Sequence, residues 1–216
     1  VDSPNGATFA NNPDSTSYIT PAIITSLLDA GTAVTLQANN DITVLSPVLS
    51  SSDMRSPFTL QAGRNINFQA NVRTPYGDLT AVAGDPAATA QYRDPGVPTI
   101  TIASGVTLNV LTGTATLAAI GGNIINNAGD SAISVINGFG RWLIYAADPA
   151  TSTEGFSGYN KHYDQSYASG DTPGYAATGN WFLYSLAPVL SVTPSNDSIT
   201  YGNTPGFDPG LAGFID

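Results

Sequence analysis

The chain carries one short pattern twice, first as VTLQANNDITV at Val34–Val44 and then as FTLQAGRNINF at Phe58–Phe68. In each copy, apolar and polar residues alternate on both sides of a polar corner, and a period of two predicts short strands with one buried face. Such a recurring unit is typical of a solenoid, because one coil cannot bury its apolar face without the next. We therefore expect an all-β fold, a parallel β-helix or solenoid. The residues expected to line its interior are Val34, Leu36, Ile42, Val44, Phe58, Leu60, Ile66, Phe68, Ile100, Ile102, Leu108, Leu117 and Ile124.

The solenoid is expected to span residues 32–147, because strand-like text returns after each break in the pattern. Alternating segments at 99–126, 131–138 and 141–147 follow a turn-rich excursion at 85–98. The predicted corners share a polar residue before an inward-facing isoleucine. We expect these Asp and Asn side chains to stack and to bond to one another, as in other polar ladders. The three pairs are Asp41-Ile42, Asn65-Ile66 and Asn123-Ile124.

A short helix is expected before the first coil, over Thr20–Gly31, so that residues 1–31 form an N-terminal cap. Thr20 could cap the helix, Pro21 suits its first position and Gly31 suits a left-handed exit. The apolar residues of one helical face are expected to cover the first coil. They are Ile23, Ile24, Leu27 and Leu28.

Charged residues are scarce and mostly acidic: they are 10% of the chain, and the net charge is −10. An acidic chain has no basic footprint, so neither nucleic acid nor an anionic membrane surface is expected as a partner. No apolar run approaches the ~18 residues of a membrane helix, so membrane insertion is not expected. The chain has no Cys and therefore no thiolate metal site. Four Asp residues precede Pro and are interpreted as turn residues, namely Asp85, Asp94, Asp148 and Asp208.

Aromatic residues concentrate near the C-terminal end, where residues 148–187 are expected to form a closing cap. We favour the interpretation that these rings pack on the last coil as a lid, since solenoid ends need a cap. The alternative is that Tyr and Trp faces stack on sugar rings. Trp142, Trp181 and Phe182 lie in strand-like text and are expected in the core. The candidate sugar-binding residues, in loop text, are Tyr159, His162, Tyr163, Tyr167 and Tyr175.

Residues 188–216 are interpreted as an extended tail or the start of a following β repeat, with a strand-like piece at Val189–Thr193. Open solenoid edges, or a strand donated by the tail from Pro194 onward, could join copies end to end. A self-assembling extracellular filament is therefore an alternative to a solitary scaffold.

No catalytic residue, metal site or cofactor is predicted. His162 is the only histidine and lacks a recognisable partner, and the chain has no GxSxG motif. A β-helix polysaccharide-active enzyme would need clustered carboxylates beside a cation. The candidates for such a cluster are Asp78, Asp85, Arg93 and Asp94, and turn formation accounts for the two that precede Pro. We therefore expect a protein that is not an enzyme.

Two parts of the chain resemble one known family. SYITPAIITSLLDAGTAVTLQANNDITV followed by FTLQAGRNINFQANV is similar to the repeats of filamentous-haemagglutinin-like exoproteins, which Gram-negative bacteria export by two-partner secretion. GRWLIYAADPATSTEG, with YNKHYDQSY and GNWFLYSLAP, resembles the segment that closes the solenoid in many of them. APVLSVTPSNDSITYGNTPGF resembles the start of an MBG-type repeat.

The resemblance implies a right-handed parallel β-helix and a structural or adhesive role, secreted or at the cell surface, in adhesion or in a matrix or biofilm. Host or matrix glycans or proteins are the partners that it implies. It supplies no catalytic motif. Because the first residue is Val and the usual amino-terminal secretion module is missing, we expect an excised or processed piece of a longer protein.

Overall fold

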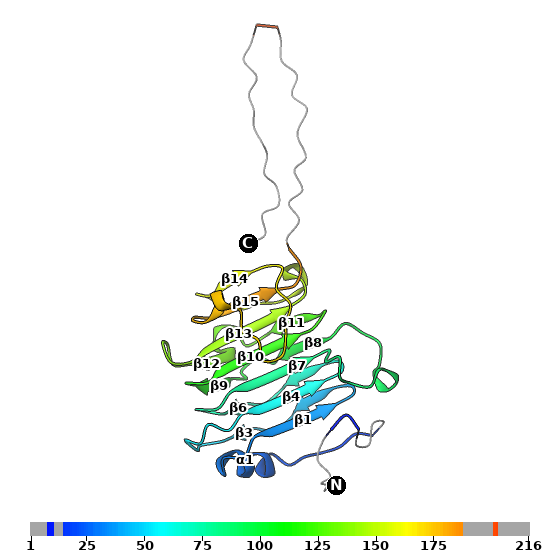
Figure 1. Ribbon diagram of the computed structural model, residues 1–216, viewed down its shortest axis with the longest axis vertical. Coiled ribbons are helices and arrows are strands. Elements are labelled where there is room, and N and C mark those ends of the chain that lie inside the picture. Colours follow the sequence, from blue (N-terminus) through cyan, green and yellow to red (C-terminus); the bar gives the residue numbers. More distant parts are fainter. Residues whose placement is uncertain (1–7, 11–14, 188–200, 203–216) are drawn as a thin grey trace.

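The structure is a computed structural model that describes residues 8–10, 15–187 and 201–202. Its strands form three parallel sheets, and successive turns of the chain stack along the long axis of the molecule (Figure 1). The first sheet has the order β1-β4-β7-β10-β13-β15-β14, the second β11-β8-β5-β2 and the third β12-β9-β6-β3. The expected parallel, solenoid-like stack is therefore confirmed.

The bounds of the strands follow the turns of the chain. The first sheet contains β1 (Val34–Ala38), β4 (Phe58–Ala62), β7 (Leu79–Ala83), β10 (Thr114–Ala119), β13 (Arg141–Ala146), β14 (Asn160–His162) and β15 (Trp181–Tyr184). The second contains β2 (Ile42–Val44), β5 (Ile66–Phe68), β8 (Thr99–Ile102) and β11 (Asn123–Asn126). The third contains β3 (Val48–Leu49), β6 (Val72–Arg73), β9 (Leu108–Leu111) and β12 (Ile133–Val135).

The repeat in the sequence fixes the register between the first two turns. Leu36 lies opposite Leu60, and Ile42 lies opposite Ile66, so that like side chains stack inside the coils. Of the interior residues expected from the sequence, all but two are buried, and those two, Leu36 and Ile42, are partly exposed on the first turn. The core is thus a stack of aliphatic and aromatic layers that is closed except at its first layer.

The expectation that the corner Asp and Asn residues stack and bond to one another is met in part. Asp41 and Asn65 are neighbours in one column, and the Asn65 amide donates to Asp41 at 3.0 Å. Thr99 lies between Asn65 and Asn123, and the Thr99 amide donates to Asn65 at 3.0 Å. Asn71 and Asp78 likewise accept from an amide of the next turn at the other two corners. A side-chain oxygen can satisfy a backbone N–H that the corner would otherwise leave unpaired, so these residues tie consecutive turns together.

The expected helix is present as α1 (Pro21–Asp29), and it covers the start of the stack. Ile24 and Leu28 are buried against the first turn, but Ile23 and Leu27 are exposed. Only two of the four residues predicted to cover the first coil are therefore buried. Thr20 makes no side-chain cap bond. None of the described helices is long and apolar enough to cross a membrane.

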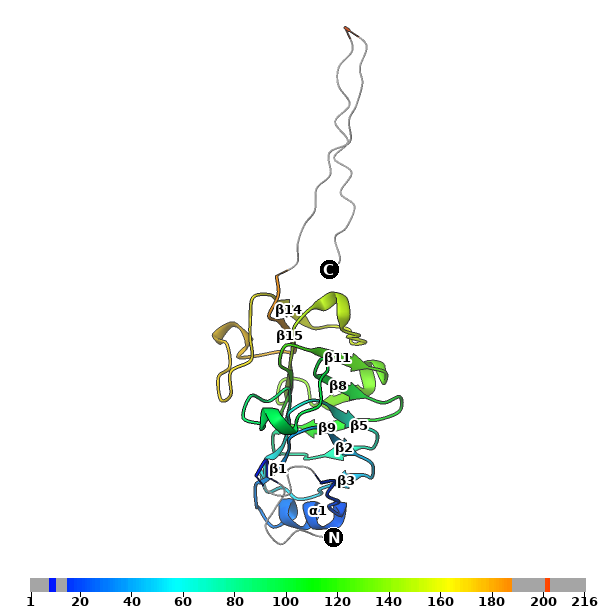
Figure 2. The same ribbon diagram turned by 90° about the vertical axis from the view of Figure 1, so that its right-hand side faces the viewer.

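Two irregular segments lie outside the first sheet, on the same side of the molecule (Figure 2). Residues 85–98, with the 3-10 helix η1 (Ala90–Tyr92), reach back to the first turn, where the Thr89 amide donates to Asn39 at 2.8 Å. Residues 163–180, with η4 (Gly174–Ala176), cover the far end of the same sheet. Two further 3-10 helices are η2 (Gly129–Ala132) and η3 (Pro149–Thr151).

The first sheet continues beyond residue 147. β15 pairs with β13, and β14, which comes earlier in the chain, pairs with the outer edge of β15. The closing segment at 148–187 thus adds two strands to the sheet rather than forming a separate layer. The strand-like piece at Val189–Thr193 and the tail from Pro194 lie outside the described residues, apart from 201–202.

Candidate functional site

The five residues predicted to bind sugar are divided between two places in the closing segment. Tyr159 and Tyr163 pack against the interior of the last turn, whereas Tyr167 packs against the outer face of the first sheet. His162 and Tyr175 are exposed on that outer side. The structure therefore does not bring the five together into one site.

The inner group is a lid of aromatic rings. The Trp142 ring lies 4.7 Å from that of Phe156 and 5.6 Å from that of Tyr159, and Phe182 contacts all three. Offset and edge-on contacts at these distances are favourable between aromatic rings, and the rings bury the open end of the stack. Trp142 and Phe182 are therefore core residues, as expected.

The only Glu and the only Lys of the chain meet at the margin of this lid. The Glu154 carboxylate accepts hydrogen bonds from the Tyr159 and Tyr184 hydroxyls, and it lies 3.4 Å from Lys161 Nζ. Burial raises the pKa of Tyr184, and the neighbouring Glu154 raises it further. A neutral Tyr184 hydroxyl thus remains a donor to Glu154, and the cluster locks β14 and β15 onto the last turn.

The outer group forms a second, smaller core. Tyr167 packs edge-on against Tyr145 at 5.2 Å, and buried Leu143 and Leu183 lie in the same cluster. Burial, the main cause, raises the pKa of Tyr145 to about 12. Tyr167 is therefore a packing residue, which leaves less of the predicted sugar-binding set at the surface.

Three rings remain together at the surface, and with a neighbouring amide we call them the cap surface: His162, Gln165, Tyr175 and Trp181. The Tyr175 ring lies 4.1 Å from that of His162 and 5.3 Å from that of Trp181, and 41% of Tyr175 is exposed. The Tyr175 hydroxyl donates to Gln165 Oε1 at 2.8 Å, and Trp181 Nε1 donates to the Thr178 carbonyl at 2.7 Å. The rings are thus held in place by contacts on several sides.

This arrangement provides an apolar ring face beside polar groups that can bond to hydroxyls, which is the chemistry of sugar recognition. Trp181 was expected in the core, but it lies opposite Leu143 in the outward-facing column of the sheet and is only partly buried. The alternation Trp181, Phe182, Leu183, Tyr184 could have shown this, because a buried Phe182 places Trp181 on the opposite face.

The carboxylates that an enzyme would need are each used in the fold. Asp78 precedes β7, and it accepts from the Thr114 amide at 2.7 Å. Asp85 follows β7, and it accepts from Gln61 at 2.9 Å. Asp94 lies 3.5 Å from Arg64, and Arg93 donates to the Gly63 carbonyl at 3.3 Å. Because a five-residue strand separates Asp78 from Asp85, these two carboxylates do not converge.

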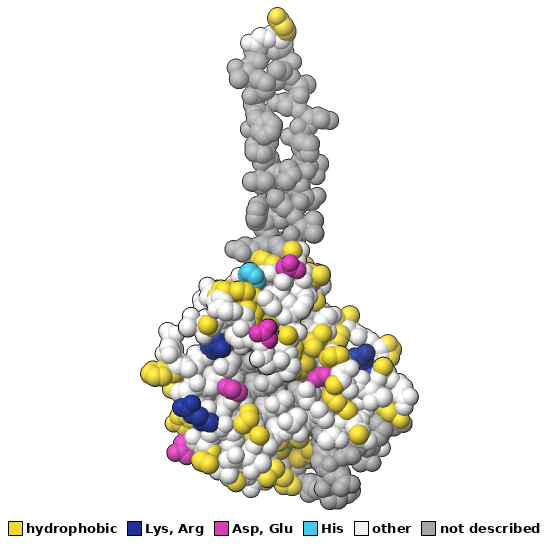
Figure 3. Space-filling view, in the orientation of Figure 1, with side chains coloured by type: hydrophobic (Ala, Val, Ile, Leu, Met, Phe, Trp, Pro, Cys, Tyr) yellow, Lys and Arg dark blue, Asp and Glu magenta, His cyan; other side chains and the backbone are white. Residues whose placement is uncertain are grey.

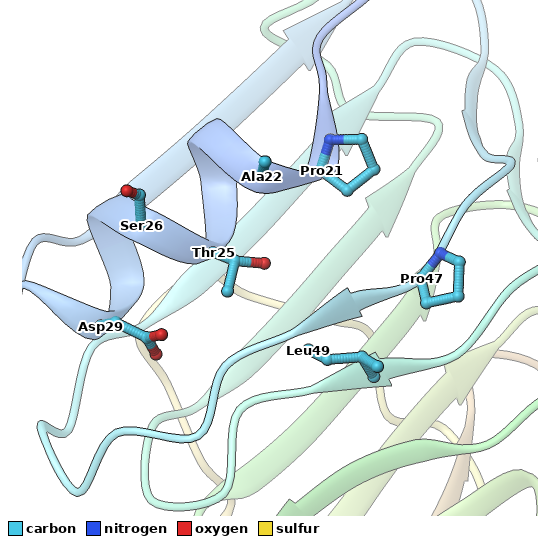
Figure 4. A pocket seen from close by; sticks show the side chains of 7 residues that line it. All are labelled: Pro21, Ala22, Thr25, Ser26, Asp29, Pro47 and Leu49. Carbon is cyan, nitrogen blue, oxygen red and sulfur yellow. The ribbon is translucent and has the colours of Figure 1, made fainter.

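Outside the closing segment, the described surface has a groove beside α1 and few charged side chains. A groove of about 450 Å³ lies between α1 and β3, where Asp29 accepts from the Ser50 hydroxyl at 2.6 Å (Figure 4). The charged side chains in Figure 3 are few and scattered, and hydrophobic side chains lie between them. Among the described residues, no group of three or more His, Cys, Asp or Glu could hold a metal ion.

Comparisons with protein-family models, with curated proteins and with solved structures gave no match to this chain. The resemblance to filamentous-haemagglutinin-like exoproteins therefore stays a prediction. A proposal of function has to be argued from the fold and from the cap surface.

Proposed function

We propose that the chain is a structural and adhesive β-solenoid segment of a filamentous-haemagglutinin-like exoprotein, wound to the right and secreted or held at the surface of a Gram-negative bacterium. Adhesion, or a place in an extracellular matrix or biofilm, is the role that this architecture suits best. The parallel stack supports the proposal, because its hydrogen bonds run along the long axis and resist extension.

The outer surface of the first turns also suits an extracellular scaffold. Thr35, Thr59, Thr80 and Thr116 form one neutral column along the first sheet. Gln37 donates to Gln61 at 2.8 Å in a second column. A repeated charge at such positions would repel itself from turn to turn, so a surface of uncharged ladders keeps the stack intact over a wide range of conditions.

The adhesive part of the proposal rests on the cap surface. The exposed ring of Tyr175, held between His162 and Trp181 at the end of the stack, is the single observation that carries it. We infer a glycan as the partner, since a ring face with an adjacent amide can stack on a sugar and bond to its hydroxyls. The solenoid would hold this surface away from the cell.

A glycan array tests this role with the whole chain and two variants. Tyr175→Ala should lose binding to the glycans that the parent retains, because it removes the exposed ring face. Tyr76→Ala is the matched control, since Tyr76 is equally exposed, at 40%, but lies at a corner of the second turn. Binding that survives Tyr175→Ala, or a parent chain that binds no glycan on the array, would contradict the adhesive role.

A further inference from the structure

The residues that the structure describes leave the interior of the solenoid incompletely filled at its first turn. Leu36 and Ile42 are partly exposed, whereas their stacking partners Leu60 and Ile66 are fully buried. A cavity of about 1460 Å³ lies against these residues, and it is lined by the first turn, by α1 with the segment at 15–19 before it, and by residues 91–94. Ile24 and Leu28 of α1 are buried at this end of the stack, and α1 lies closest to β3. The space that α1 leaves is therefore next to β1 and β2.

The strand that borders this cavity has a free edge. Within the described residues, β1 pairs with β4 and with no other strand. The Val34 amide donates to the Pro57 carbonyl at 3.0 Å, and the Gly63 amide donates to the Ala38 carbonyl at 2.9 Å. Because backbone groups alternate in direction along a strand, Thr35 and Gln37 point their N–H and C=O groups away from β4. The backbone of Phe9 bonds to side chains beside this edge: its amide donates to Gln37 Oε1 at 3.4 Å, and its carbonyl accepts from Asn39 Nδ2 at 2.8 Å.

The size and lining of the cavity indicate what would fill it. Pockets for drug-sized molecules have volumes of about 300–1,000 Å³, so this cavity is larger than a small ligand requires. An extended peptide that adds to a sheet edge gains main-chain hydrogen bonds, and its alternate side chains enter the space beneath. At every later turn of this chain a strand of that kind occupies the equivalent position, with FTLQA directly above β1.

The charges around the cavity favour a neutral peptide. The charged residues in its lining are Asp41, Arg64, Arg93 and Asp94, two of each sign. Arg64 lies 2.7 Å from Asp41 and 3.5 Å from Asp94, so these charges compensate one another. Partial burial acts to raise the pKa of Asp41, but the hydrogen bonds from Arg64 and from the Asn65 amide outweigh it and lower that pKa.

We propose that the first turn is a binding site for an extended, uncharged peptide, which adds as a parallel strand to the free edge of β1 and places alternate aliphatic side chains over Leu36 and Ile42. The site uses no residue of the cap surface. Its test is therefore independent of glycan binding, and either proposal can fail alone.

The chain itself supplies the probe, a fluorescent peptide with the sequence of Phe58–Phe68, whose binding to the whole chain is followed by fluorescence anisotropy. In the expected pairing, the amides that correspond to Phe58, Leu60 and Ala62 donate to β1, and those of Thr59 and Gln61 point away. N-methylation at the Leu60 position should therefore weaken binding at least about tenfold, a loss of about 1.4 kcal/mol. N-methylation at the Gln61 position should leave binding unchanged.

A variant of the protein gives a second readout. Leu36→Asp should weaken binding of the unmodified peptide, because it places a charge beneath the added strand. Ile136→Asp, at an exposed site just after β12 and away from the first turn, should not. Three outcomes would overturn the proposal: no saturable binding, equal effects of the two N-methylated peptides, or a homodimer that occupies this end and excludes the peptide.

Discussion

At the scale of single residues, close approach of the backbone at one corner explains a column of glycines. A Cβ atom on Gly77 would lie 2.0 Å from the Ser56 carbonyl oxygen, and one on Gly113 would lie 2.3 Å from that of Gly77. No side chain fits at such distances, so consecutive turns can stack here only through glycine. The same corner also has Asp78, which binds the Thr114 amide.

Gly113→Ala should therefore lower the free energy of unfolding by about 1–3 kcal/mol, because an added methyl group forces the two turns apart. Urea titration followed by circular dichroism measures this loss. Gly174→Ala is the matched control, since nothing lies within 4 Å of a Cβ atom there, and its effect should stay within about 0.5 kcal/mol. Equal stability of Gly113→Ala and the parent would show that the turns are not in close contact at this corner.

At the scale of elements, the first sheet changes character along the stack. One outward-facing column begins with Gln37 and Gln61, continues with Val82, Ala118, Tyr145 and Leu183, and ends with His162. The change from polar to apolar coincides with the segment at 163–180, which covers this part of the sheet. A strand that is buried on both faces loses the alternation of polar and apolar residues, as RWLIYA at β13 does.

This covered face should make the cap sensitive to base. The folded-state pKa of Tyr145 is about 12, above the ordinary value of about 10, because burial disfavours the phenolate. The contribution of neutral Tyr145 to the free energy of unfolding is fully present below about pH 10, and it is lost as the pH rises toward about 12. The urea midpoint of unfolding should therefore decrease more between pH 8 and pH 11 for the parent than for Tyr145→Phe. A Tyr76→Phe control should fall as much as the parent, and an equal fall in all three would contradict this burial.

At the scale of the whole molecule, the repeat at Val34–Val44 and Phe58–Phe68 was enough to predict the stack, since a period of two and its recurrence determine both the inward face and the register. The order β13-β15-β14 could not be predicted. The residues between β14 and β15 have no periodicity, so nothing local indicates that the later strand enters between the two earlier ones. The cap surface was missed in part because Trp181 and Phe182 were both expected in the core, although neighbouring residues of a strand point to opposite faces.

The account depends on parallel turns that stack in register, and cysteine pairs measure this directly because the chain has no Cys of its own. Thr59 and Thr80 are register partners on adjacent strands, whereas Thr59 and Thr116 are two strands apart, about 9.6 Å at the usual spacing. A disulfide needs Cα atoms within about 7 Å. Under mild oxidation, Thr59→Cys with Thr80→Cys should form a disulfide that mass spectrometry detects, and Thr59→Cys with Thr116→Cys should stay reduced. Failure of the first pair, or equal oxidation of both pairs, would contradict the stack.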